Sequence, residues 1–227
     1  MTLSPPGLVL SFALVALAGI ASGCDRGLAG ESGPTGPEPT IGRRTVVWQG
    51  RPLSTPLPRP AFELRDTAGQ PYDFAARTSG RLTLLFFGYT SCPDVCSMHM
   101  NHIAAALRGL EIELPGAREA IDVVFVAIDP ARDTPDQLRS WLDHFDPGFV
   151  GLTGDEAELQ AAQRAAAVPT AVRDPGSEDE SYTMSHASYV LLYTQDDLAH
   201  LRYPFDTGTG DWLQDLRRLV RDGWRAS

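Results

Sequence analysis

The amino-acid sequence predicts an α/β fold, with a mixed central sheet flanked by helices and preceded by an N-terminal hairpin. Short apolar segments typical of strands alternate with segments of helical periodicity from about residue 81 onward. Two strand-like segments and an amphipathic helix close the chain. Cys92 and Cys96 lie between the first central strand and its helix. A cysteine pair at that junction favours a thioredoxin-like form of the fold.

The first half of the folded part is predicted from four segments. Residues 62–74, FELRDTAGQPYDF, alternate apolar and polar residues around a glycine, which indicates a hairpin. Residues 81–89, RLTLLFFGY, form a continuous apolar run typical of a buried strand. After the cysteines, residues 102–110 have helical spacing, and residues 122–128, DVVFVAI, predict a second buried strand.

The second half continues the alternation of strands and helices. Residues 129–135, DPARDTP, indicate a turn, and Thr134 followed by Pro135 is typical of a helix start before residues 136–145. Pro169 ends a later helix. The remaining predicted elements are a strand at 149–154, a helix at 156–167, a polar loop at 174–182, a strand pair at 188–193 and 198–203, and a closing helix at 211–224.

The composition fits one globular domain with a tail and argues against nucleic-acid binding. The chain of 227 residues is 43% hydrophobic and 21% charged, values that are normal for a globular protein. Its formal net charge is -10. A protein this acidic repels phosphate backbones, so nucleic acid is not an expected partner.

The N-terminal residues predict export from the cytoplasm. Residues 1–23 contain no charged side chain, and their apolar centre has the length of a signal-peptide core. The sequence ASGC ends in Cys24, which is typical of a bacterial lipoprotein whose cysteine becomes lipidated. The alternative is an uncleaved membrane anchor, since a charge-free run of this length spans a bilayer. Both interpretations place the domain at the periplasmic face of the cell membrane.

These observations divide the chain into three predicted regions. Residues 1–23 are the signal peptide or membrane anchor. Residues 24–59 are rich in Gly, Pro and Ser and predict a flexible tether. Residues 60–227 are predicted to form the folded domain.

Cys92 and Cys96 form a CxxxC pair in a domain that is predicted to be exported. With Cys92 in the loop leaving the strand and Cys96 in the first helical turn, the helix N-terminus is expected to favour thiolate. The spacing permits a disulfide, and two such thiolates also chelate a soft ion such as Cu(I). The pair alone therefore leaves redox chemistry and metal binding open.

His186 is the best candidate for a third ligand among the five histidines. It stands in TMSHASYVLLY, directly before a predicted strand. In a thioredoxin-like sheet, the loop entering this strand lies beside the cysteine loop. The alternative is a histidine with a purely structural role.

Three motifs in this order, FFGYTSCPDVC, AIDPARDTP and MSHASYVLLY, resemble the Sco/SenC family of copper chaperones. The resemblance covers about residues 60–221. It implies a membrane-tethered, thioredoxin-like domain facing the periplasm, in which Cys92, Cys96 and His186 bind copper. It also implies a part in assembling the binuclear copper centre in subunit II of cytochrome c oxidase.

The resemblance extends to Asp129, which matches an acidic residue near the family's copper site. Asp129 is expected to orient a ligand or balance charge, and the alternative is a loop cap. The chain departs from several relatives at Ser185, where they carry Asp, and at Ser97, where they often carry Pro. Neither departure removes a ligand, but both bear on copper affinity and on the potential of a disulfide.

Four further side chains with metal-binding potential follow the cysteines on the same predicted helix: Met98, His99, Met100 and His102. They either pass copper on, or one methionine packs in the core while the histidines are solvated. Methionine is common as core filler, which favours the second interpretation. Asp94 is expected to cap the helix.

We expect a copper-binding assembly factor that passes one copper ion to a partner's cysteines by ligand exchange, without substrate turnover. The alternative is an enzyme, a thiol–disulfide oxidoreductase that reduces the partner's cysteines and closes a Cys92–Cys96 disulfide. A peroxidase-like thiol enzyme would need one activated cysteine and a peroxide pocket, of which the sequence gives no specific sign. A structural module with a buried, permanently oxidised pair is the remaining alternative.

Overall fold

The structure, a computed structural model, describes residues 47–93, 95–175 and 182–226. Within these residues one sheet is ordered β1-β10-β9-β4-β5-β6-β2-β3. Its strands are β1 (Arg51–Pro58), β2 (Glu63–Asp66), β3 (Pro71–Asp73), β4 (Leu82–Gly88), β5 (Ile121–Ala127), β6 (Val150–Thr153), β9 (Tyr189–Tyr193) and β10 (Leu198–Pro204). Strands β4, β5 and β6 are parallel, whereas the other pairs are antiparallel. The predicted mixed sheet, N-terminal hairpin and thioredoxin-like fold are confirmed.

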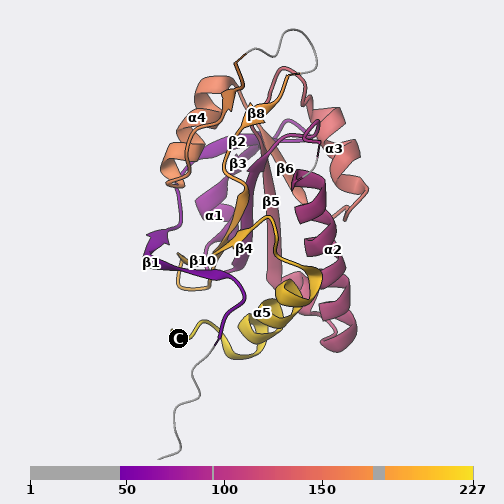
Figure 1. Cartoon of the computed structure of the whole chain (residues 1–227), viewed down its shortest axis with the longest axis vertical. Helices are drawn as coiled ribbons and strands as arrows, with labels where there is room; N and C mark the ends of the chain where they lie inside the picture. The colour runs from indigo at the N-terminus through magenta and orange to yellow at the C-terminus, as the bar shows by residue number, and fades with distance from the viewer. Residues whose placement is uncertain (1–46, 94, 176–181, 227) are drawn as a thin grey trace, which may run out of the picture. The chain divides into compact units, whose positions relative to one another are not determined.

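The order of the parallel strands determines on which face of the sheet their connecting helices lie. They are α1 (Phe74–Thr78), α2 (Val95–Glu113), the short 3-10 helix η1 (Ala117–Ala120), α3 (Pro135–Asp143), α4 (Glu156–Ala165) and α5 (Thr209–Asp222). The steps from β4 to β5 and from β5 to β6 run the same way along the sheet. Right-handed crossovers therefore put α2 and α3 on one side of the central strands, and α1 and α4 lie on the other (Figure 1).

Burial explains the apolar sequences of the two central strands. Every residue of β4 is buried, and so is all of β5 except the partly buried Asp122. A strand covered on both faces needs a continuous apolar run instead of an alternating one. The predicted start of α3 is also confirmed, because Thr134 accepts a hydrogen bond from the backbone N–H of Gln137 at 3.3 Å.

The predicted tether over residues 24–59 is wrong at its C-terminal end. Residues 51–58 form β1, which pairs with β10 at the edge of the sheet. Trp48 is also buried, and its ring stacks on that of Trp224 with centroids 4.9 Å apart. The folded domain therefore begins before residue 60. The prolines of this segment suggested a tether, but an edge strand tolerates them.

A short ribbon lies apart from the main sheet. Strands β7 (Val172–Arg173) and β8 (Met184–Ser185) pair with Val172 opposite Ser185. The two strands flank the segment predicted as a polar loop, residues 174–182, of which residues 176–181 lie outside the described part. Strand β8 leads directly to His186, so the ribbon bears on the candidate site.

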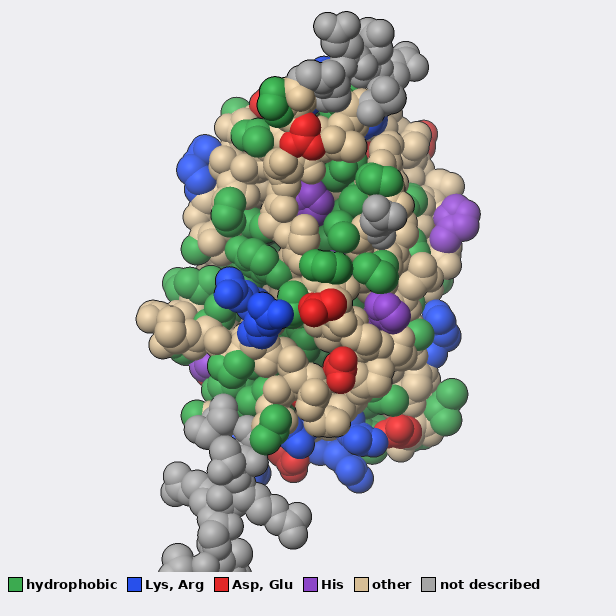
Figure 2. All heavy atoms as spheres, viewed as in Figure 1, with side chains coloured by type: hydrophobic (Ala, Val, Ile, Leu, Met, Phe, Trp, Pro, Cys, Tyr) green, Lys and Arg blue, Asp and Glu red, His purple; other side chains and the backbone are tan. Residues whose placement is uncertain are grey.

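Residues 1–46 lie outside the described part, so the signal peptide or anchor and the lipidation of Cys24 stay predictions. Among the helices described, none combines the length and the apolar character needed to cross a bilayer. On the face shown in Figure 2, acidic and basic side chains are interspersed, and they lie beside one another at the lower end of the domain.

Asp215, on α5, binds the start of the folded domain through hydrogen bonds and is expected to stabilise it. Its buried carboxylate accepts the backbone N–H groups of Gln49 at 2.8 Å and Gly50 at 2.9 Å, and the Tyr203 hydroxyl at 3.0 Å. Asp215→Ala leaves these donors without an acceptor, so we expect the free energy of unfolding to fall by about 2–4 kcal/mol. Denaturant titration measures the loss, and limited proteolysis should show faster cleavage within residues 47–58.

The exposed Asp222 lies on the same helix and provides the matched control. Asp222→Ala should leave the unfolding midpoint and the cleavage rate close to those of the unsubstituted chain. An Asp215→Ala variant as stable as the unsubstituted chain would contradict the assigned role of this carboxylate.

Candidate metal centre

The candidate site lies where two strand ends meet. Strand β9 runs antiparallel to β4, with Leu191 opposite Leu85. The residues that precede β9 therefore lie at the same edge of the sheet as the residues that follow β4. This topology brings His186, just ahead of β9, to the cysteine loop, as the sequence analysis predicted.

The three predicted ligands converge at this edge. One ligand atom from each of Cys92, Cys96 and His186 lies within 4.8 Å of the other two. Sγ of Cys96 is 3.8 Å from Nε2 of His186. Nδ1 of His186 is 3.1 Å from the carbonyl oxygen of Ala187. A proton on Nδ1 donates to that carbonyl and leaves the lone pair of Nε2 facing the sulfur.

The sulfurs are shielded from water, whereas the imidazole is partly accessible. Cys96 is fully buried, and Cys92 is 8% exposed. His186 is half-buried, and a hollow of about 370 Å³ opens beside it, lined by Tyr89, Cys92, Pro93, Met184, His186 and Ser188 among others. A ligand or partner group can therefore approach from the side of Cys92 and His186.

A glycine allows Cys96 to lie close to the sheet. Cys96 is in the first turn of α2, and Gly88 ends β4. A Cβ atom at Gly88 would lie 2.9 Å from the Cys96 sulfur and 2.9 Å from Cε2 of Phe125. Both contacts are shorter than real Cβ contacts, so any larger residue here displaces the sulfur or the Phe125 ring.

Asp133 holds the loop that carries Cys92. Its carboxylate accepts the hydroxyl of Thr90 at 2.5 Å and the backbone N–H of Thr90 at 3.1 Å. The Asp133 side chain is 1% exposed. Burial raises its pKa to about 6, although the two hydrogen bonds from Thr90 oppose the change. The motif DPARDTP contains this residue, but the sequence alone did not show that it reaches the cysteine loop.

Deprotonating both thiols is unfavourable, because they are buried and lie close to each other. The hydrogen bond with Cys92, followed by burial, raises the pKa of the Cys96 thiol well above its usual range. The thiolate stabilisation expected from the helix N-terminus is therefore outweighed at Cys96. A bound cation offsets this cost by taking the place of the protons. The structure has Cys92 and Cys96 as thiols, and the disulfide between them stays a prediction.

Asp129 is buried just after β5, at the start of the turn that ends with Asp133. Its side chain accepts the Tyr182 hydroxyl at 2.6 Å and Nε of Arg132 at 2.5 Å. Its carbonyl oxygen accepts the backbone N–H groups of Arg132 and Asp133, which closes the turn. The side chain thus joins the turn to the segment that carries His186, and a role in orienting that ligand stays a prediction.

The side chains that follow the cysteines on α2 have separate environments. Met100 is fully buried, which confirms a core role, whereas Met98 is 36% exposed. The prediction that the histidines are solvated is wrong for His99, which is fully buried and whose pKa burial lowers to about 4. His99 faces inward because α2 packs on the sheet, with Nε2 3.4 Å from the carbonyl oxygen of Ser188.

His102 and Asp94 are further polar residues that lie near the cysteines in sequence. His102 is half-buried, with Nδ1 2.8 Å from the hydroxyl of Thr209 at the start of α5. The predicted helix cap at Asp94 lies outside the described residues. Tyr89, Asp133 and Tyr182 are the neighbours of the site that the sequence did not reveal, because each acts through contacts between distant segments.

Comparisons with known proteins place the chain in a family. The SCO1/SenC family model matches residues 52–221. A relative from Stutzerimonas stutzeri, whose name refers to copper binding, is 35% identical over 195 residues, covering 83% of this chain and 90% of the relative. The copper-bound structure of Bradyrhizobium japonicum ScoI is 31% identical with a TM-score of 0.61, covering 71% of this chain and 98% of that one.

A second solved structure supports the same fold. The apo form of Sco1 from Thermus thermophilus is 29% identical with a TM-score of 0.64. The match covers 76% of this chain and 97% of that chain. Both matches cover nearly the full length of the solved chains, so the described sheet and its flanking helices agree with those structures.

The raised pKa of Asp133 predicts a pH dependence of stability. Because the folded state holds this proton up to about pH 6 and the unfolded chain releases it near its ordinary value of 3.8, the contribution of Asp133 is fully present below pH 3.8 and is lost as pH rises through 6. The loss is on the order of 3 kcal/mol, at about 1.4 kcal/mol per pH unit. The free energy of unfolding of the metal-free chain, measured between pH 4 and pH 7, should fall less steeply with rising pH in Asp133→Asn than in the unsubstituted chain.

The exposed carboxyl of Asp136, in the first turn of α3, is the matched control. Asp136→Asn should leave the slope of stability against pH almost unchanged. Equal slopes for Asp133→Asn and the unsubstituted chain would show that the buried carboxyl does not titrate as described.

Proposed function

The chain belongs to the SCO1/SenC family, and from this premise we propose that it binds one copper ion through Cys92, Cys96 and His186 and serves copper delivery. The observation that carries the proposal is the convergence of two thiols and one imidazole within 4.8 Å. These three groups come from two segments that are distant in sequence and meet only in the folded domain.

The donor set fits Cu(I) in particular. Thiolates are soft ligands, Cu(I) prefers them, and an imidazole completes a three-coordinate site. Burial of both sulfurs favours a bound cation, since the positive charge compensates thiolates that would otherwise be costly in the interior. The names of the Stutzerimonas and Bradyrhizobium relatives, which refer to copper, support the same assignment.

Transfer is proposed to proceed by ligand exchange at the open side of the site. Cys96 is fully buried, whereas Cys92 and His186 line the hollow. An incoming pair of thiols from a partner therefore meets these two ligands first, and Cys96 is the last to release the ion. The resemblance to the family favours the binuclear copper site of cytochrome c oxidase subunit II as the acceptor.

The proposed setting is the periplasmic face of the cell membrane. The charge-free segment 1–23 and Cys24 support a lipid anchor or an uncleaved anchor that keeps the domain near a membrane-bound acceptor. Tethering of this kind raises the effective concentration of donor and acceptor.

A thiol–disulfide reductase is the second candidate function. It is favoured by the position of two thiols at a strand–helix junction, where an attacking and a resolving cysteine can close a disulfide. The raised pKa of Cys96 makes Cys92, which lies closer to the surface, the attacking thiol in this scheme. His186 would then have no direct part in the reaction.

Anaerobic Cu(I) titration against a chromophoric chelator distinguishes the two functions. The full chain is used in detergent with Cys24→Ala, so that only Cys92 and Cys96 contribute thiols. We expect one tightly bound Cu(I), with affinity lowered by at least about 100-fold in Cys92→Ser and Cys96→Ser, and about 10-fold or more in His186→Ala.

The exposed His144 at the end of α3 supplies the matched control for His186. His144→Ala should bind Cu(I) as the parent chain does. Copper binding that is weak or indifferent to His186, together with rapid disulfide exchange by the cysteine pair, would overturn the copper proposal in favour of the reductase.

A further inference from the structure

We propose that Tyr182 is a positioning residue that holds His186 against the two cysteines. It does so through a clamp, defined here as Tyr182 with Asp129, Arg132 and Arg173. The inference rests on the proposed function, because it concerns how one ligand of the copper site is held. It assigns a role to an aromatic side chain in a segment that looked like a polar loop.

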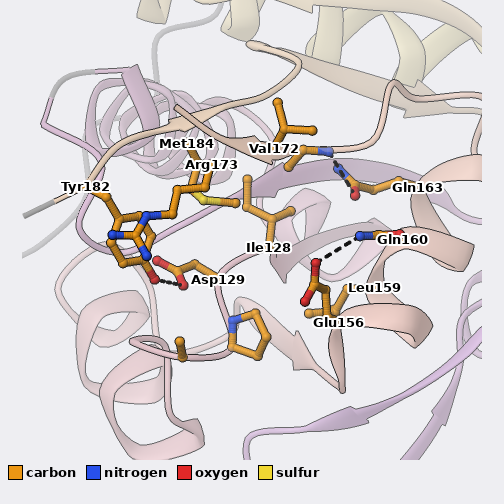
Figure 3. A pocket seen from close by; sticks show the side chains of 13 residues that line it. Ile128, Asp129, Glu156, Leu159, Gln160, Gln163, Val172, Arg173, Tyr182 and Met184 are labelled. Atoms are coloured by element: carbon orange, nitrogen blue, oxygen red, sulfur yellow. Dashed lines mark hydrogen bonds between the residues drawn. The ribbon is translucent and has the colours of Figure 1, made fainter. Parts of the chain in front are cut away.

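The Tyr182 ring lies between two guanidinium groups. The Cζ atom of Arg132 is 3.7 Å from the ring centroid, and that of Arg173 is 3.9 Å away. Figure 3 shows Arg173 beside the ring and the Tyr182 hydroxyl directed at Asp129. Each of these arginine contacts is well inside the range in which a cation attracts an aromatic face.

Hydrogen bonds hold both the side chain and the backbone of Tyr182. The hydroxyl of Tyr182 donates to Asp129 at 2.6 Å, and the backbone carbonyl of Tyr182 accepts Nη1 of Arg132 at 2.8 Å. Arg132 in turn donates Nε to Asp129 at 2.5 Å. The ring, the hydroxyl and the backbone of Tyr182 are thus tied to the turn that follows β5.

Tyr182 begins a segment of five residues that ends at His186, here called the histidine strap (residues 182–186). Along the strap, the backbone N–H of Met184 donates to the Tyr89 hydroxyl at 3.3 Å, and Ser185 donates its hydroxyl to Asp174. The Tyr89 ring meets the His186 ring edge-on, with centroids 5.6 Å apart. These contacts transmit the position of Tyr182 to the imidazole.

The strap needs such a clamp because its own secondary structure is slight. Strand β8 has two residues and pairs only with β7, and both residues of β7 are exposed. A two-stranded ribbon of this length is marginal by itself in water. Beside it, a cavity of about 350 Å³ separates the strap from α4 and is lined by Asp129, Arg173, Tyr182 and Met184 among others (Figure 3). The clamp therefore adds to the fixation that the short β7–β8 pairing and the packing of Met184 against the core provide.

The consequence concerns copper affinity. When the ligand-bearing segment is in place for only a fraction of the time, the apparent affinity falls by that fraction. Residues that orient a metal ligand typically contribute 10-fold to 100-fold in affinity. We therefore expect Tyr182→Ala to weaken Cu(I) binding about 10-fold, and Tyr182→Phe, which keeps the ring between the arginines, about threefold.

A double-mutant cycle tests whether the effect passes through His186. The full chain with Cys24→Ala is titrated with Cu(I) as Tyr182→Ala, as His186→Ala and as the double variant. We expect Tyr182→Ala to weaken Cu(I) binding about 10-fold when His186 is present and less than twofold when it is absent. A purely structural loss of stability would weaken binding equally in both backgrounds, and that result overturns the proposal.

Tyr72 on β3 supplies matched controls, because it also lies against an arginine, with Cζ of Arg77 5.6 Å from its ring centroid. Tyr72→Phe and Tyr72→Ala remove the same atoms at a distance from the candidate site. We expect Tyr72→Ala to lower the free energy of unfolding while leaving Cu(I) affinity within twofold of the parent. A loss of affinity as large as that in Tyr182→Ala would contradict the assignment.

Hydrogen exchange of the metal-free chain separates this proposal from the proposed function. The amides of the histidine strap should exchange faster in Tyr182→Ala than in the parent, with those of β4 and β5 unchanged. If His186→Ala does not weaken Cu(I) binding, the proposed ligand set fails, and faster strap exchange still supports the clamp. Unchanged strap exchange in Tyr182→Ala overturns the clamp whatever copper does.

Discussion

The site depends on the hydrogen bonds made by the turn at residues 129–133, because this turn holds both segments that carry the candidate ligands. On one side, Asp133 accepts two hydrogen bonds from Thr90 in the cysteine loop. On the other, Asp129 and Arg132 bind Tyr182 at the start of the histidine strap. Two segments that are distant in sequence are thus fixed to five consecutive residues at the end of one buried strand.

The sheet makes this arrangement possible, and burial gives it its chemistry. The parallel pair β4–β5 delivers the cysteine loop and the turn to one edge, and the antiparallel β9 returns the chain to that edge. Gly88 then allows the Cys96 sulfur to lie against the strand, away from water. Two adjacent buried thiols resist becoming thiolates alone, so the site favours a soft cation over an empty, doubly ionised state.

The sequence predicted the parts of the fold that have strong local patterns. The buried strands β4 and β5 were recognisable because double-sided burial demands continuous apolar runs, and the start of α3 was recognisable from Thr134 and Pro135. The meeting of Cys92, Cys96 and His186 followed from placing these strands in a thioredoxin-like order. Strand β1 was missed because its prolines are tolerated only at an edge, which local sequence does not reveal. The clamp at Tyr182 was missed because its partners come from two other segments, Asp129 and Arg132 from the turn after β5 and Arg173 from β7.

The proposed copper centre holds one copper ion through two sulfurs and one imidazole nitrogen. X-ray absorption at the copper edge, recorded on the full chain with Cys24→Ala and one equivalent of Cu(I), observes those ligands directly. We expect a first coordination shell of two sulfur atoms and one nitrogen, with the outer-shell scattering of an imidazole ring. A shell of sulfur alone, or one in which His186→Ala leaves the spectrum unchanged, would contradict it.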